Sequence, residues 1–508
     1  MKYAYTFLLS LCVSVGVTAQ DLVSIELRGE LSRELFNFGA ASAGFEGFTA
    51  EYGFEYYVVE YTSLNLAGEL DTLSGLLSVP TPNTATVFPR LLSQHGTSQT
   101  SDDAPSATFI NFADLPGSYI DLSVVYATQG YVTVAPDYLN MGLDDEGFHP
   151  YVHAASEARA AADMLLALEA DSTYAALTND QLFVTGYSQG GHASMALHER
   201  IATDVDYAAL GEVTAAAHMS GPYALEEVML DELILNDSTY LFVGFVPFTV
   251  LSFQAAYPEL EQDLDAIFRP AVVPAVERFR DEWQAGTYTL GEMTEDVAVA
   301  IARLDPDNGD TLVYPYEMFT AEFEAELRDD ADSPWRAALR QNNTYRFTSA
   351  APTRLYYCTG DELVPSANTL LAADSLAARG AVDLEAVRVD SDEEPLGHGA
   401  CAEPAILASL EFFGALQDIQ TDGNTGLSDA LPGRIDWRLA GASLSVETER
   451  PDEAYTLRLF DALGRELLRR PAYRSGELVD LSGLPTGFAV ARLGDARGRS
   501  ASRSFVVR

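Results

Sequence analysis

The sequence predicts an α/β fold, followed by a small all-β domain. Residues 186–192, Gly-Tyr-Ser-Gln-Gly-Gly-His, follow the apolar run 181–185 and precede the helix-like stretch 193–200, which is the pattern of a strand that turns sharply into a helix. Two further strand-like runs are followed by polar side chains, Asp361 and His398. Since 508 residues exceed what one core usually organises, more than one domain is expected.

The first 19 residues have the composition of a cleavable secretory signal. They carry one lysine and an apolar run, and they end in the small-residue stretch Val17-Thr18-Ala19 before Gln20. The run is too short to span a bilayer, and no later run has the length for it. The sequence therefore predicts an exported protein that is soluble after processing and makes no stable membrane insertion.

Ser188 stands at the centre of a Gly-x-Ser-x-Gly motif, with Gly186 two residues before it and Gly190 two residues after it. In a nucleophile elbow the serine is held in a strained backbone conformation and exposed above the sheet, so that small residues are needed at both flanking positions. An ordinary strand-helix turn in a glycine-rich loop can carry the same letters. The assignment therefore depends on the residues further along the chain.

Asp361 follows the strand-like run 354–360, and His398 follows the run 386–389 and an acidic loop. A serine hydroxyl is a weak nucleophile until an imidazole removes its proton, and a buried carboxylate must orient that imidazole. We therefore assign His398 as the general base and Asp361 as the orienting group. Glu362 is the alternative carboxylate.

A loop after an early apolar run is expected to help bind the oxyanion of the tetrahedral intermediate. The run 88–94 is followed by His95-Gly96-Thr97. One backbone N–H is expected from Gln189, directly after the nucleophile, and the other from Thr97, with Gly96 as the alternative. His95 itself is expected to be structural.

From about residue 56 to 413 the chain resembles the secreted lipase and esterase branch of the α/β-hydrolase superfamily. The order Ser, Asp, His matches, and residues 134–142 resemble the Pro-Asp-Tyr-x-Gly-x-Gly motif of that branch, with Asn140 where glycine is usual. The resemblance implies an α/β-hydrolase catalytic domain over residues 20–414. It also implies a secreted enzyme that cleaves carboxylic esters of small molecules or lipids through an acyl-serine intermediate.

Two other functions remain open. The same machinery can cleave amides, which would make the protein a secreted serine peptidase, and an amine-binding carboxylate pair would favour that reading. A surface adhesin could also keep the fold without turnover.

Residues 225–346 are more than a crossover between two strands requires, and we expect them to form a mainly helical cap over the active site. The run 241–253 is strongly apolar and aromatic, and most of it is expected to form the core of the cap. Phe245 and Phe248 are predicted to line an acyl pocket, because a cap excludes water and supplies apolar contact.

Removal of the signal leaves two cysteines, Cys358 three residues before Asp361 and Cys401 three residues after His398. If the carboxylate and the imidazole touch, the two sulfurs are expected to be neighbours. A disulfide is favoured in an oxidising compartment, and two buried free thiols are the alternative.

Residues 415–433 have the composition of a linker, and residues 434–508 are predicted to form a compact β-sandwich. The stretch 479–488 resembles the C-terminal sorting domain of the bacterial type IX secretion system, with Phe488 where tyrosine is usual. This resemblance implies export through the periplasm, the secretion machinery as a partner, and a secreted or cell-surface location. A carbohydrate-binding or adhesive β-module is the alternative.

The formal net charge of −46 disfavours binding to nucleic acid and to anionic membranes. From residue 433 onward 13 arginines face 10 acidic residues, so the balance there is +3 and the remainder carries −49.

No phosphate-binding loop or dinucleotide fingerprint is present, and no cofactor or metal is predicted. Residues 305–310 resemble a calcium loop, but Tyr316 stands where glutamate is required, so we interpret them as a solvated turn. Four histidines without ligand spacing are expected to be structural: His153, His192, His198 and His218.

Overall fold

The structure of the chain is a computed structural model. It describes residues 20–42, 48–82, 86–107, 122–144, 147–237, 239–304, 314–421, 435–440, 443–461, 466–484, 487–495 and 500–507. The predicted signal, the calcium-like stretch 305–310 and most of the predicted linker lie outside these residues. No helix within the described ranges is both long and apolar enough to cross a membrane.

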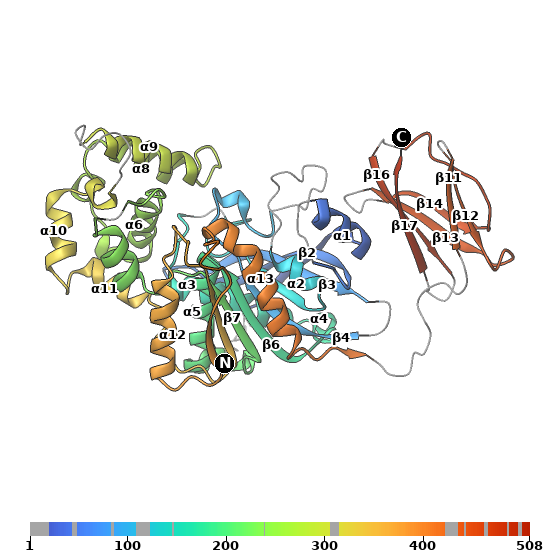
Figure 1. The fold of residues 1–508 in the computed structure, drawn as a ribbon, viewed down its shortest axis with the longest axis horizontal. Coiled ribbons are helices and arrows are strands. Elements are labelled where there is room, and N and C mark those ends of the chain that lie inside the picture. Colours follow the sequence, from blue (N-terminus) through green and yellow to red (C-terminus); the bar gives the residue numbers. More distant parts are fainter. Residues whose placement is uncertain are drawn as a thin grey trace, which may run out of the picture.

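A mixed sheet of ten strands forms the centre of the molecule (Figure 1). Its strand order is β1-β2-β3-β5-β4-β6-β7-β8-β9, and β10 pairs with β4. Strands β1, β2 and β3 pair antiparallel, and β3 also pairs antiparallel with β5. Strands β5, β4, β6, β7, β8 and β9 are parallel to one another. The strands are β1 (Leu22–Leu31), β2 (Gly53–Leu64), β3 (Leu70–Thr81), β4 (Thr86–Gln94), β5 (Val132–Pro136), β6 (Thr178–Tyr187), β7 (Ala215–Met219), β8 (Thr353–Tyr357), β9 (Leu384–Arg388) and β10 (Gln420–Thr421).

Helices cover both faces of this sheet, which is why strands such as β5 and β7 are mostly apolar and are buried along their whole length. One face packs against α3 (Ala154–Glu169) and α5 (Gln189–Thr203). The other face packs against α2 (Leu122–Ala127) and α13 (His398–Gly414). The other helices among the described residues of this part are α1 (Arg33–Ser42), α4 (Ser172–Ala175), α12 (Ala367–Ala378) and the short turns η1 (Ser101–Asp103) and η3 (Val205–Leu210).

The segment between β7 and β8 is helical, as the sequence predicts, and it lies at one end of the sheet (Figure 1). Side-chain caps define several of its helix starts: Thr289 and Glu292 form a capping box, and the side chains of Thr320 and Ser333 accept hydrogen bonds from backbone amides. Its elements are η4 (Leu225–Ile234), α6 (Phe245–Ala256), η5 (Pro258–Leu260), α7 (Leu264–Ile267), α8 (Val273–Glu282), α9 (Leu290–Ala302), η7 (Pro315–Met318), α10 (Ala321–Asp329) and α11 (Pro334–Gln341). We call this segment the cap.

The C-terminal part contains two small antiparallel sheets, ordered β11-β12-β15 and β14-β13-β16-β17. Their strands are β11 (Ile435–Ala440), β12 (Ser443–Thr448), β13 (Tyr455–Asp461), β14 (Glu466–Tyr473), β15 (Val479–Asp480), β16 (Gly487–Gly494) and β17 (Ser500–Val507). Strands β13 and β14 pair antiparallel, with Leu459 opposite Leu468. Inward-facing side chains such as Val446, Leu457 and Leu493 form a core separate from those of the main sheet.

Candidate active site

The turn between β6 and α5 has the geometry that the Gly-x-Ser-x-Gly motif predicts. Ser188 occupies a strained backbone conformation, with φ 61° and ψ −124°. A Cβ atom on Gly186 would lie 2.1 Å from the carbonyl oxygen of Gly190, and one on Gly190 would lie 2.0 Å from that of Gln94. Backbone atoms cannot yield to such contacts, so both positions require glycine.

The structure brings the three predicted side chains together. Nε2 of His398 lies 2.8 Å from Oγ of Ser188, and its Nδ1 lies 2.8 and 3.0 Å from the two carboxylate oxygens of Asp361. Because a carboxylate only accepts, Nδ1 carries a proton, and in the neutral imidazole Nε2 then has a free lone pair. The imidazole can therefore accept the proton of the serine hydroxyl.

Asp361 is itself held by the turn that carries it. Its Oδ1 accepts hydrogen bonds from the backbone amides of Leu363 and Val364, at 3.1 and 2.8 Å, and the side chain is 1% exposed. The alternative carboxylate, Glu362, instead accepts a hydrogen bond from the backbone amide of His398 at 3.0 Å. The structure thus brings Asp361 rather than Glu362 to the imidazole, and Glu362 anchors the first turn of α13.

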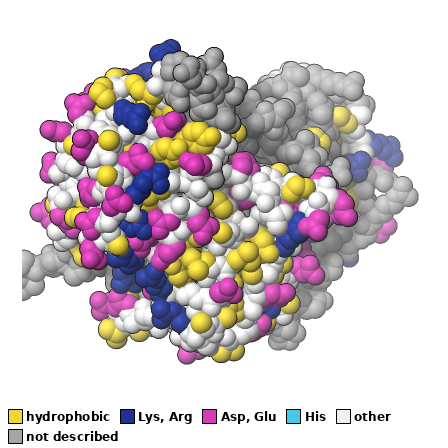
Figure 2. All heavy atoms as spheres, turned by 60° about the vertical axis from the view of Figure 1, so that its left-hand side comes forward, with side chains coloured by type: hydrophobic (Ala, Val, Ile, Leu, Met, Phe, Trp, Pro, Cys, Tyr) yellow, Lys and Arg dark blue, Asp and Glu magenta, His cyan; other side chains and the backbone are white. Residues whose placement is uncertain are grey.

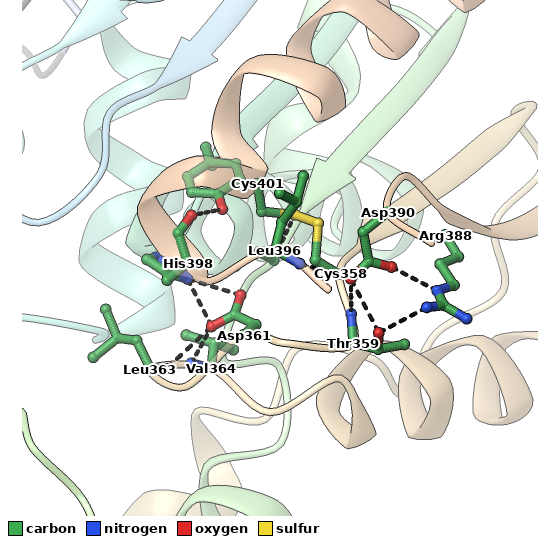
Figure 3. The surroundings of a disulfide bond; sticks show 12 residues. Cys358, Thr359, Asp361, Leu363, Val364, Arg388, Asp390, Leu396, His398 and Cys401 are labelled. Atoms are coloured by element: carbon green, nitrogen blue, oxygen red, sulfur yellow. Dashed lines mark hydrogen bonds and ion pairs between the residues drawn. A yellow bond between two sulfur atoms is a disulfide. The ribbon is translucent and has the colours of Figure 1, made fainter. Parts of the chain in front are cut away.

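Two further connections join the segments that carry Asp361 and His398 (Figure 3). The expected disulfide between Cys358 and Cys401 is present, with a Cα–Cα distance of 6.0 Å. In addition, Asp390 accepts hydrogen bonds from the amides of Thr359 and Leu396 at 2.8 and 3.1 Å and pairs with Arg388. Desolvation opposes ionisation of Asp390, but these bonds outweigh it and hold its pKa well below the ordinary value.

The loop after β4 lies against the elbow, as expected for an oxyanion-binding loop. A Cβ atom on Gly96 would be 3.7 Å from Cβ of Ser188. Within the described part of the chain, the backbone amides of Thr97 and Gln189 donate to no acceptor. The ring of His95 stacks on Tyr138, with 4.1 Å between centroids, and contacts carbonyl oxygens, which suits a structural role.

The loop of the Pro-Asp-Tyr motif explains why Asn140 can replace the usual glycine. Asn140 has φ 61°, a left-handed conformation that asparagine tolerates better than most residues. Its backbone amide donates to Asp144 and its side-chain amide donates to the carbonyl oxygen of Phe148, at 2.7 and 2.8 Å.

A cavity runs from Ser188 into the cap, and its lining is almost wholly apolar. Phe245 lines it, as the sequence predicts. Phe248 does not: its ring stacks on Tyr151 at 4.6 Å between centroids, packs against Trp283 and is 1% exposed, so it belongs to the core of the cap. This is a correction to the sequence-based prediction. The sequence-based reasoning missed further lining residues, including Met229, Phe319, Phe323, Leu327, Trp335 and Leu339.

Phe319, Phe323 and Leu327 follow one another at helical spacing on the sequence, and that spacing was the available signal for this wall of the cavity. It could not distinguish a cavity wall from the core of the cap. No group of three or more His, Cys, Asp or Glu side chains in the described ranges is arranged to hold a metal ion.

No protein-family model matches the chain, and no curated protein matches it in sequence. Solved structures do match. A candidate hydrolase from Legionella pneumophila is 25% identical over 80% of this chain and 100% of its own, with a TM-score of 0.63. The rice cell wall degrading esterase LipA from Xanthomonas oryzae is 24% identical over 79% and 97%, with a TM-score of 0.62. Lipase A from Candida antarctica is 16% identical over 75% and 78%, with a TM-score of 0.53. The predicted α/β-hydrolase fold is therefore confirmed.

Proposed function

We propose that the chain is a secreted serine hydrolase that cleaves carboxylic esters through an acyl-serine intermediate. The observation that carries this proposal is the unbroken chain of hydrogen bonds from Ser188 through His398 to Asp361, at an elbow that opens into an apolar cavity. The fold alone would not carry it, since one fold hosts many activities.

In the proposed reaction, Oγ of Ser188 attacks the ester carbonyl carbon while Nε2 of His398 takes the hydroxyl proton. Asp361 stabilises the resulting imidazolium, and the amides of Thr97 and Gln189 donate to the oxyanion. When the intermediate collapses, the C–O bond of the ester breaks and the alcohol leaves with the proton from His398. Water then attacks the acyl-serine by the same route and releases the carboxylic acid and free Ser188.

The cavity supports an acyl substituent as the group bound under the cap. None of the described residues that line it is a carboxylate, so nothing there would pair with the amine of a peptide substrate. Glu226, a buried carboxylate of the cap, is already paired with Arg336 and Arg340. These contacts favour an ester hydrolase over a peptidase. Two of the structural neighbours, which are named as an esterase and a lipase, favour the same interpretation.

We also propose that the enzyme acts outside the cell. The signal-like residues 1–19, the sorting-domain resemblance near residues 479–488 and the disulfide, which suits an oxidising compartment, support this location. The C-terminal domain would then be the part that the secretion machinery binds. Export from the native host with and without residues 434–508 tests this, and equal export of both forms would refute it.

The test of the activity is hydrolysis of p-nitrophenyl esters from acetate to palmitate, with Ser188→Ala and a set of peptide amides beside the wild type. We expect ester turnover that Ser188→Ala abolishes and slow or no amide turnover. Folded protein without turnover of any ester would refute the proposal. Amide turnover faster than ester turnover would favour the peptidase.

A further inference from the structure

Directly behind the elbow lies a cluster of buried polar side chains that the proposed reaction does not use. It consists of Gln189 and His192 on α5, Glu157 on α3 and His149 in the loop before α3. Glu157 and His192 are 0% exposed, and the other two are almost fully buried. Removing charged side chains from water costs free energy, and this cost can exceed the attraction between them. Stability alone therefore does not explain why such a cluster is buried here.

The hydrogen-bond partners of His192 fix its protonation state. Its Nδ1 lies 2.8 Å from Oε2 of Glu157, and its Nε2 lies 2.9 Å from the carbonyl oxygen of Asn342. A carboxylate and a carbonyl oxygen are both acceptors, so both ring nitrogens must donate. Beside an ionised Glu157, only the imidazolium form satisfies both contacts, and it makes His192 and Glu157 a buried ion pair.

Consistent with this, the pKa of Glu157 is lowered: desolvation raises it, but the charge and hydrogen bond of His192 together outweigh that effect.

The same cluster holds the side chain of Gln189. Its Nε2 donates to Oε1 of Glu157 at 2.9 Å and to Nε2 of His149 at 3.0 Å, so that both amide hydrogens are used. His149 can accept there because its Nδ1 donates to the carbonyl oxygen of Leu139. Burial lowers the pKa of His149 to about 4, which keeps it neutral as this arrangement requires. Gln189 is thereby fixed between two partners in α3 and its preceding loop.

The cluster also reaches the end of the cap. Asn342, which follows the last cap helix α11, accepts from His192 through its backbone oxygen and from the amide of Ala154 through its side chain. Its side-chain amide donates to the hydroxyl of Tyr257 at 2.7 Å. One set of bonds thus connects the elbow helix, the start of α3 and the end of the cap.

We propose that Glu157 and His192 form a buried ion pair that holds Gln189 in the orientation in which its backbone amide can donate to the oxyanion. The same pair links this orientation to the end of the cap, because His192 donates to the backbone oxygen of Asn342. The proposal rests on the proposed ester hydrolysis. Charge-assisted hydrogen bonds are shorter and stronger than neutral ones, which suits a device that must hold one residue in one orientation. Glu157 and His192 are positioning residues, because neither touches the reacting atoms.

The decisive variant is Glu157→Gln. A glutamine can accept from Gln189 and donate to Nδ1 of a neutral His192, which still donates to Asn342, so every hydrogen bond can be kept while the charges disappear. A purely structural cluster would tolerate this change. Gln189→Met is the second variant, since it keeps the volume and both charges but disconnects Gln189 from the pair. The same-helix control is His198→Asn, because His198 is buried on α5 and contacts His218 and Ser349 instead.

Two measurements test the pair. The first is ¹⁵N-edited NMR at pH 8, in which the signals of the His192 ring are identified by their absence from the spectrum of His192→Asn. We expect two ring N–H signals for His192 in the wild type and one in Glu157→Gln.

The second is ester kinetics. We expect kcat to fall by about tenfold or more in Glu157→Gln and Gln189→Met with little change in KM, because the lost alignment matters only when the oxyanion forms. Affinity for a trifluoromethyl ketone, whose serine adduct carries an oxyanion, should fall by the same factor as kcat/KM. His198→Asn should leave both quantities unchanged.

A single ring N–H for His192 in the wild type would overturn the ion pair. If Glu157→Gln and Gln189→Met are folded and keep the kcat and the inhibitor affinity of the wild type, the positioning role is overturned. If the wild type hydrolyses no ester, the proposed function fails and the positioning role falls with it. The NMR result stands apart from that failure, because it reads the ion pair without any turnover.

Discussion

At the scale of single residues, glycine determines whether the elbow can form. Gly190→Ala would bring a Cβ atom to 2.0 Å from the backbone oxygen of Gln94, which cannot move without displacing β4. We expect a loss of about 3 kcal/mol in the free energy of unfolding and of about 100-fold in kcat. Urea unfolding and ester kinetics measure both. Gly414→Ala is the control, because nothing lies within 4 Å of a Cβ atom there, and equal behaviour of the two variants would contradict the steric argument.

Buried histidines make stability depend on pH. Burial lowers the pKa of His149, His153 and His198 from 6.5 to about 4. Between these values the unfolded chain binds more protons than the folded chain, so stability is full above pH 6.5 and is lost as the pH falls toward 4. Each histidine contributes up to about 3 kcal/mol to this loss.

Urea unfolding at pH 8, 6 and 5 checks the pH prediction, with His198→Asn beside the wild type. The variant should show a shallower fall in the free energy of unfolding between pH 6 and 5, because it has one buried imidazole fewer. A wild-type free energy that stays constant over this range would contradict the prediction.

At this scale, residues that belong to a recognisable motif could be predicted, whereas residues that meet only through packing could not. The elbow, the order Ser188, Asp361, His398 and the disulfide partners could be predicted because short motifs and spacing specify them. The pairing of Glu157 with His192 could not, since no motif singles out these two residues and only the packing of α3 on α5 joins them. The sequence analysis expected His192 to be structural and made no prediction about its charge.

At the scale of elements, two ties hold the end of β8 against the start of α13. We expect the double variant Cys358→Ser with Cys401→Ser to lose about 3 to 4 kcal/mol of unfolding free energy, because the disulfide closes a span of 43 residues. Its kcat should fall less than that of Ser188→Ala, since the bonds of Asp390 still join the same segments. Urea unfolding and ester kinetics, each with and without a thiol reductant, measure these two losses. A wild-type enzyme whose unfolding free energy and kcat are both unchanged by the reductant would contradict the prediction.

The helices of the cap decide which acyl groups fit. Leu339 on α11 lines the cavity and is only partly buried, so Leu339→Trp can fill space there without breaking the core of the cap. We expect kcat/KM for palmitate esters to fall by about tenfold relative to butyrate esters, because each lost methylene contact weakens the transition state. Leu370→Trp, on the exposed face of α12, is the control. Equal loss for both chain lengths would show that the cavity does not hold the acyl chain.

The placement of cap side chains also shows where sequence reasoning stops at this scale. The run 241–253 is so uniformly apolar that it gives no preferred face, and both Phe245 and Phe248 could have met the substrate. Phe248 is placed in the core of the cap by its packing against Tyr151 and Trp283, and those residues come from other segments. Helix type is a local property, whereas the direction of one ring within a cap is set by the assembled core.

At the scale of the whole molecule, charge and core are divided between two parts. Figure 2 shows the side that carries the cap, where Asp and Glu side chains are spread among apolar and arginine side chains. The formal balance is −49 up to residue 432 and +3 beyond it. Excess negative charge keeps a protein soluble but repels itself in the compact state, and added salt screens that repulsion.

The two parts should also unfold separately. The C-terminal sheets have a core of their own, and β10 ends at Thr421, before the strands of that core begin. An ion pair between Arg492 and Glu30 joins the parts, and both side chains are at least one-third exposed, so it contributes little. We therefore expect a chain that ends at residue 421 to keep the kcat/KM of the full protein for esters, and to unfold in one calorimetric transition where the full chain shows two. Loss of activity on truncation, or a shared transition in the full chain, would show that the domains depend on each other for folding.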